Sequence, residues 1–150
     1  MTWTPHATVA VVIEQEGRYL LVKELSEDNI VYNQPAGHIE ENESIFDAAT
    51  RETLEESGYE IELNAIVGLY TYKAPSNGVT YYRICFEGRA IRKKTDVLDA
   101  DILSAHWLTY DEIKSLEQQG QLRSPLVINC IDDFRSAPRL PLSFIKEFNH

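Results

Sequence analysis

Apolar and polar positions repeat with different periods along this chain, and each period predicts a different element. Residues 8–14 are β-branched and apolar, which predicts a buried strand. Residues 18–23 form its return strand after a Glu-Gly turn. Further strands are expected at residues 61–72, 79–91 and 106–108.

Three helices are expected between and after these strands. The first spans residues 44–57, begins with a serine cap and ends at Gly58, which suits the left-handed residue of a helix end. The second spans residues 110–118, and the third begins at Ser124-Pro125. Strands with a helix between them and helices at the end predict an α/β fold whose mixed sheet is covered on both faces.

Composition narrows the class of protein. A chain of 150 residues with 43% hydrophobic residues is most simply one domain, residues 1–150, with a single core. The net charge of −10 disfavours the binding of long nucleic acids, whose phosphates require a basic surface. No apolar run reaches membrane-spanning length. Cys85 and Cys130 are isolated in apolar surroundings, so buried free thiols are expected. Together with the lack of a signal-peptide pattern, this predicts a cytoplasmic protein.

The first helix carries acids where its apolar stripe should continue. On a helical wheel Ile45, Ala49, Glu52 and Glu56 fall on one side, and Glu55 stands beside them. Such like-charge crowding destabilises a helix unless a cation compensates it, and clustered carboxylates select hard cations such as Mg2+. A merely solvated acidic face would instead lie opposite the apolar stripe.

Residues 37–59, GHIEENESIFDAATRETLEESGY, resemble the Nudix box, G-x5-E-x7-R-E-U-x-E-E-x-G-U, in which U is aliphatic. Only Thr53 and Tyr59 depart from the pattern, at packing positions. The matching residues are Gly37, Glu43, Arg51, Glu52, Glu55, Glu56 and Gly58. The resemblance implies a Nudix-type α/β/α sandwich with a mixed sheet and extra C-terminal helices, the helical extension covering about residues 122–150.

The resemblance also implies roles for the box residues. Glu52 and Glu56 are the expected ligands of Mg2+, with Mn2+ as the alternative ion, and the carbonyl near Gly37 adds an oxygen. Glu55 is a further ligand or the general base. Pyrophosphate hydrolysis needs such a set, because a metal screens phosphate charge and a carboxylate accepts the proton of the attacking water.

Two supporting roles follow from the same resemblance. Arg51 is expected to orient the acids through a charge-assisted hydrogen bond with Glu43. Members of this family often carry one more acid before a strand that contains tryptophan. Asp101 is the preferred candidate for that acid and Asp99 the second, since both precede Trp107.

Beyond the box, the chain most resembles the NudJ-type phosphatases in Pro5-His6, residues 33–38 and residues 122–127. This implies hydrolysis of nucleoside tri- and diphosphates, and of the pyrophosphates of thiamine and its pyrimidine precursor. Two alternatives remain: a Nudix hydrolase for ADP-ribose, dinucleoside polyphosphates or capped RNA, and a non-catalytic nucleotide-binding module. Either a monomer or a homodimer is compatible with the sequence.

Substrate contacts are predicted from residue chemistry. Arg83 is the first candidate for a phosphate contact and Arg123 the second, because Arg123 precedes a helix N-terminus, where anions bind. Tyr72 and Trp3 are candidates for stacking on an aromatic base. His38 is expected to be a hydrogen-bonded structural residue outside catalysis.

Overall fold

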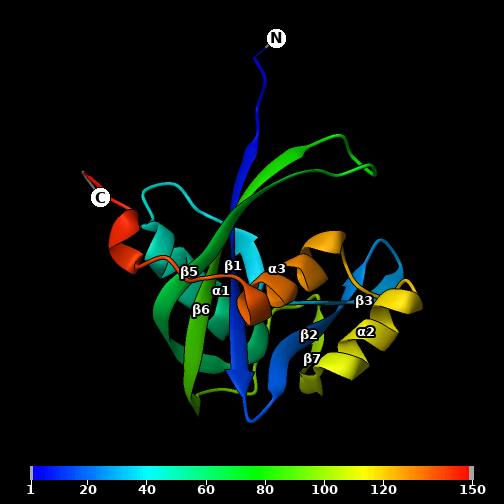
Figure 1. Ribbon diagram of the computed structural model, residues 1–150. Helices are drawn as coiled ribbons and strands as arrows, with labels where there is room; N and C mark the ends of the chain where they lie inside the picture. The colour runs from blue at the N-terminus through cyan, green and yellow to red at the C-terminus, as the bar shows by residue number, and fades with distance from the viewer. Residues whose placement is uncertain (1, 149–150) are drawn as a thin grey trace.

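The computed structural model describes residues 2–148 as a mixed β-sheet with helices on both faces (Figure 1). The strands are β1 (His6–Gln15), β2 (Arg18–Ser26), β3 (Asn29–Asn33), β4 (Ala36–His38), β5 (Tyr59–Lys73), β6 (Thr80–Lys93) and β7 (Ile102–Thr109). The helices are α1 (Ile45–Ser57), α2 (Tyr110–Gln118), α3 (Pro125–Ser136) and the 3-10 turn η1 (Leu142–Phe144). The predicted α/β/α sandwich is confirmed.

Strand β1 lies at the centre of the sheet, in the order β3-β2-β1-β6-β5. On one edge it pairs in parallel with β6 along His6–Ile13. On its other edge it pairs antiparallel with two strands. The first of these, β4, pairs with Thr8 to Ala10, and the second, β2, pairs with Glu14 and Gln15. The sheet therefore branches along one edge of β1.

Alternation along β1 divides the core into two layers. Val9, Val11 and Ile13 pack on the side of α1, together with Ala48 and Ala49 of that helix. Ala10 and Val12 pack on the other side, against α3 residues including Val127 and Ile131. In Figure 1 the cyan-green α1 and the orange α3 accordingly lie on opposite faces of β1. Cys85 and Cys130 are buried free thiols, as predicted.

The C-terminal segment is less helical than expected. After α3 ends at Ser136, the described part contains only η1, and residues 149–150 of the expected helical extension lie outside the described residues. Leu140 instead lies extended beside β5, exchanging two backbone hydrogen bonds with Ile66 at 2.8 and 3.0 Å. Pro138 and Pro141 flank this segment and lack the amide hydrogen that a helix needs. None of the helices in residues 2–148 is long and apolar enough to span a membrane.

Candidate active site

Helix α1 carries most of the candidate site, and its two ends are fixed by local chemistry. The Ser44 hydroxyl oxygen accepts a hydrogen bond from the Asp47 amide at 3.1 Å, which caps the first turn. Gly58 ends the helix at φ 81°, a conformation that glycine adopts without a steric penalty. The expected boundaries of this helix are therefore confirmed.

The buried stripe of α1 differs from the helical-wheel prediction. Ala49, Thr53 and Ser57 face the core, while Glu52 and Glu56 lie at its border. The Thr53 hydroxyl donates to the Ala49 carbonyl at 2.8 Å. This bond explains how a polar residue occupies a packing position where the box usually has an aliphatic one, because its hydroxyl is satisfied within the helix.

Three carboxylates meet where α1 ends. Glu52, Glu56 and Asp99 each offer an oxygen within 4.8 Å of the others, and this is the only group of metal-ligating side chains found among the described residues. Burial raises the pKa of Glu56 to about 9, and the nearby Glu52 adds to the shift. Burial likewise raises the pKa of Glu52 and of Asp99. A cation at this point would relieve the repulsion between these groups.

The short strand β4 holds the acids against the sheet. The Ala36 amide donates to Glu56 at 3.0 Å. The neighbouring Gly37 leaves room for Glu52, because a Cβ atom at Gly37 would overlap the Glu52 carboxylate. The glycine at the start of the box is thus required by close packing against its central acid, and its backbone lies beside the cluster.

Arg51 joins the acids of the box into one network. Its guanidinium donates to Glu43 through Nε at 2.6 Å and Nη2 at 3.0 Å, the pair expected from the sequence. Its Nη1 donates to Glu52 and Glu55 at 2.8 Å each. These bonds raise the pKa of Arg51, and the same pairing lowers the pKa of Glu43. Arg51 therefore keeps a positive charge beside the cluster and fixes the orientation of Glu52 within it and of the neighbouring Glu55.

Of the two predicted acids before β7, the structure places Asp99, the second candidate, in the carboxylate cluster, whereas the preferred candidate Asp101 is not one of its members. The Asp99 amide donates to the Glu55 carbonyl at 2.9 Å, so the loop docks on the end of α1 at this residue. Asp101 instead accepts, through its carbonyl, a hydrogen bond from the Leu25 amide at 3.0 Å. Spacing from Trp107 could not separate the two acids, because the docking depends on backbone bonds between distant segments.

A fourth carboxylate near the cluster was missed in the sequence. Glu24 on β2 is buried, and its charge contributes to the raised pKa of Glu56. It pairs with Arg123 at 2.7 Å, which brings the second predicted phosphate contact close to the acids. The sequence predicted that this strand ends at residue 23, so Glu24 fell outside it. An acidic residue within a buried strand is the sequence signal that could have identified Glu24 as a candidate.

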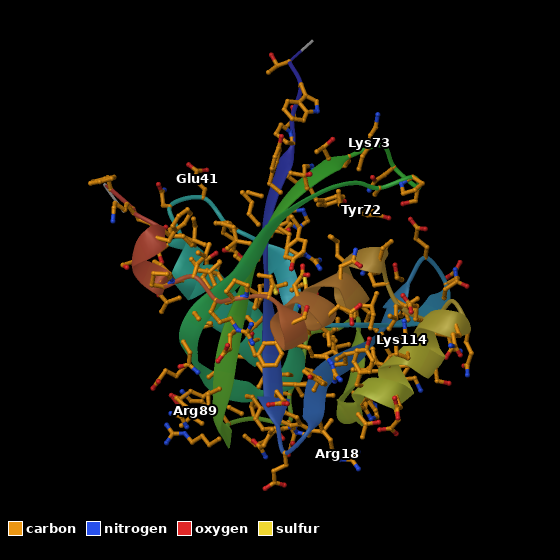
Figure 2. All side chains as sticks on the ribbon, viewed as in Figure 1. Arg18, Glu41, Tyr72, Lys73, Arg89 and Lys114 are labelled. Atoms are coloured by element: carbon orange, nitrogen blue, oxygen red, sulfur yellow. The ribbon has the colours of Figure 1, made fainter. Side chains whose placement is uncertain are left out.

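The remaining candidates lie on the sheet. Arg83 is half-buried on the inner strand β6, where its Nη1 donates to the side-chain amide oxygen of Gln34 at 3.3 Å. Tyr72 is labelled near the tip of the β5–β6 hairpin in Figure 2. It lies on the same face as Arg83, because its cross-strand partner Tyr81 is two residues from Arg83 on β6. Trp3 is not brought to this face, since it packs on Tyr82, whose side chain points the other way.

His38 contacts a second histidine. Its Nε2 lies 2.9 Å from Nδ1 of His6, and the two rings pack edge-on. Burial lowers the pKa of His38, and the neighbouring His6 contributes to the shift. The hydrogen-bonded state expected from the sequence is present, and its partner is one that sequence reasoning did not identify.

Comparison with known proteins supports the same assignment. A model of the NUDIX domain family matches residues 4–128. The chain is 36% identical over 149 residues to the phosphatase NudJ of Escherichia coli strain K12, covering 97% of this chain and 93% of that protein. It superposes on a solved NUDIX hydrolase from Nitrosomonas europaea with a TM-score of 0.92 at 41% identity, covering 97% of this chain and 98% of the other. A MutT protein structure from Methanosarcina mazei Go1, 19% identical with a TM-score of 0.72 and coverage of 90% and 96%, shares the fold.

The fold and the carboxylate cluster, taken with these similarities, define an α/β/α hydrolase that acts on pyrophosphate bonds. The chain belongs to the Nudix hydrolase family. Members of this family work with a divalent metal ion, and the residues present fit one, because an all-oxygen donor set suits a hard cation.

Proposed function

We propose that this protein is a Mg2+-dependent phosphohydrolase that cleaves the phosphoanhydride bonds of nucleoside tri- and diphosphates and of related organic pyrophosphates, such as thiamine pyrophosphate. The carboxylate cluster of Glu52, Glu56 and Asp99 carries the proposal. Similarity to the phosphatase NudJ across 97% of the chain supports the reaction class. Mn2+ is the alternative ion, since it accepts the same oxygen ligands.

In this proposal Glu52, Glu56 and Asp99 hold the ion, with the carbonyl near Gly37 as a further oxygen. When bound, the ion screens phosphate charge and acidifies water. Glu55 is the proposed proton acceptor: its side chain is 42% exposed, and Arg51 holds it at 2.8 Å. Arg51 and Glu43 do not contact substrate but fix the directions of the acids.

Arg123 is the proposed contact for the substrate phosphates. Its Nη1 bonds to buried Glu24, and its side chain is 47% exposed, so the rest of the guanidinium can reach a ligand. Its amide donates to the Tyr32 carbonyl at 2.8 Å, which pins its backbone to β3. A bidentate arginine edge placed beside the cluster suits phosphate oxygens.

The first test is a substrate panel assayed with Mg2+ and with EDTA. GTP, GDP, ATP, thiamine pyrophosphate and ADP-ribose are incubated with the purified protein, and the phosphate-containing products are identified. We expect Mg2+-dependent release of phosphate or pyrophosphate from the nucleotides and from thiamine pyrophosphate. Cleavage of ADP-ribose alone would favour the alternative substrate class, and tight binding without any turnover would favour a nucleotide-binding module.

The Glu56→Gln variant tests the metal assignment. We expect kcat to fall on the order of 100-fold or more, because a ligand of the cation is lost while the packing volume is kept. Glu41→Gln is the matched control, since Glu41 is an exposed acid in the same box, on the loop labelled in Figure 2. Full activity of Glu56→Gln would show that the proposed cluster does not bind the catalytic ion.

A further inference from the structure

Four neighbouring strands place one row of side chains across the face of the sheet that α3 covers. Strand register aligns His38 with Thr8 and Thr8 with Arg83. Arg83 is in turn aligned with Tyr70 on β5. The next row toward the core contains Ala10 and Cys85, which pack under α3. The row of Thr8 and Arg83 therefore lies at the border between the core and the open part of this face.

Two buried polar atoms in this row have no hydrogen-bond partner among the described residues. They are Oγ1 of Thr8, a residue only 4% exposed, and Nε of Arg83. An unmatched buried donor is costly, since it loses its hydration without gaining a partner. The two residues are register partners on β1 and β6, so both unsatisfied groups lie in the same part of the sheet. Such a point is suited to a ligand.

The charge of Arg83 is also uncompensated. Within residues 2–148 no carboxylate forms an ion pair with it, and the Gln34 side-chain amide oxygen is its single hydrogen-bond acceptor, at Nη1. Nη1 is thus engaged, while Nε and Nη2 have no acceptor among the described residues. These two nitrogens form one edge of the guanidinium, and such an edge can donate two parallel hydrogen bonds to a ligand.

The surroundings of Arg83 suit a flat organic group. Beside its row lies another row of rings, in which His6 is aligned with Tyr81 and Tyr81 with Tyr72. The His6 and Tyr81 rings pack edge-on with centroids 5.4 Å apart. Gln34, which holds Arg83, is two residues from Ala36, whose amide holds Glu56. A substrate anchored at the cluster can therefore extend from β4 onto this face of the sheet.

We propose that Arg83, oriented by Gln34, is a specificity residue that binds the O6/N7 edge of a 6-keto purine, so that guanine and hypoxanthine nucleotides are preferred over adenine nucleotides. The inference rests on the proposed function, because it assigns the base subsite of the same active site. An arginine edge matches the two acceptors of guanine O6 and N7, whereas adenine presents an amino donor at position 6. Thr8, the register partner of Arg83 on β1, offers a further hydroxyl.

The same arginine edge would also fit a phosphate group, and substitution separates the two ligands. A base contact affects nucleotides according to the substituent at position 6, whereas a phosphate contact affects all of them equally. Glutamine donates and accepts in the pattern that adenine N6/N7 requires. Arg83→Gln is therefore expected to change the ranking of substrates as well as the rate.

The experiment compares kcat/KM for GTP, ITP and ATP in the wild type, Arg83→Gln and Arg83→Lys. In the wild type we expect GTP and ITP to exceed ATP by about fivefold or more, the lower end for one bidentate base contact. Arg83→Lys should bring the ratio toward one, and Arg83→Gln should reverse it. Arg89→Gln is the control on the same strand, since Arg89 is exposed at the other end of β6 (Figure 2).

Equal loss for all three nucleotides, or an unchanged ratio in Arg83→Gln, would overturn the inference. Calorimetric binding of GMP, IMP and AMP separates this failure from failure of the proposed function, because binding requires no hydrolysis. GMP and IMP binding more tightly than AMP in an Arg83-dependent manner, without turnover of any nucleotide, would sustain the base subsite while refuting the proposed hydrolysis of these nucleotides. Folding of each variant is checked by circular dichroism.

Discussion

At the scale of single residues, Arg51 organises the acids of the candidate site. Arg51 satisfies Glu43, Glu52 and Glu55 with one guanidinium. Like-charged neighbours on a helix surface repel, so this cation stabilises an arrangement that the acids alone would disfavour. The resemblance to the Nudix box predicted the Arg51–Glu43 contact, which the structure shows. The contacts of Arg51 with Glu52 and Glu55 were resolved only by the structure.

Gly37→Ala should impair the site through a single methyl group. The new Cβ would overlap the Glu52 carboxylate and force it away from the cluster. We expect the Mg2+ concentration for half-maximal activity to rise about tenfold or more, as when groups that orient a metal ligand are lost. Gly17→Ala is the control: it is strained at φ 79° but faces open space, so stability should fall while Mg2+ dependence stays constant. An unchanged Mg2+ dependence in Gly37→Ala would contradict the assignment of Glu52.

At the scale of elements, α1 was predicted well in extent and less well in orientation. A wheel drawn from apolar residues placed Glu52 and Glu56 on the buried stripe, whereas the buried residues are Ala48, Ala49, Thr53 and Ser57. All four are small, which allows the helix to approach the sheet closely. A hydropathy pattern does not identify such a buried face, because threonine and serine count as polar residues.

The raised pKa of Glu56 predicts how the stability of the metal-free protein depends on pH. A carboxyl group whose pKa is higher in the folded state favours folding while it is protonated. Its contribution is complete below the ordinary value of 4.5 and is lost as the pH rises toward about 9. Chemical denaturation in EDTA between pH 5 and 9 should therefore show a decline that is smaller in Glu56→Gln. Parallel profiles for the two proteins would contradict the burial of this acid.

At the scale of the whole molecule, the cluster joins segments that are distant in the sequence. Glu52 and Glu56 come from α1, Asp99 from the loop before β7, and the supporting amide from β4. The acids of α1 could be predicted because they share one helix. Glu24, Gln34 and Asp99 could not be placed, because their positions depend on the branching of the sheet and on the docking of a loop.

A site assembled in this way should couple metal binding to global stability. A cation that binds the folded chain alone stabilises it by about 2.7 kcal/mol at 100 times its dissociation constant. We expect Mg2+ to raise the melting temperature of the wild type in a concentration-dependent manner, and Ca2+, which also takes oxygen ligands, to act similarly. Glu52→Gln should reduce the shift while Glu41→Gln preserves it. A wild-type melting temperature that does not respond to either ion would contradict a native metal site.

The loop that carries Asp99 is attached to α1 by its backbone at both ends. The amides of Lys94 and Thr95 donate to the Gly58 carbonyl, and the Asp99 amide donates to the Glu55 carbonyl. Residues 96–98 between these anchors can therefore change in composition, and even in length, without displacing the acid. We therefore expect related sequences to vary at residues 96–98 while the backbone anchors that position Asp99 beside the carboxylate cluster are kept.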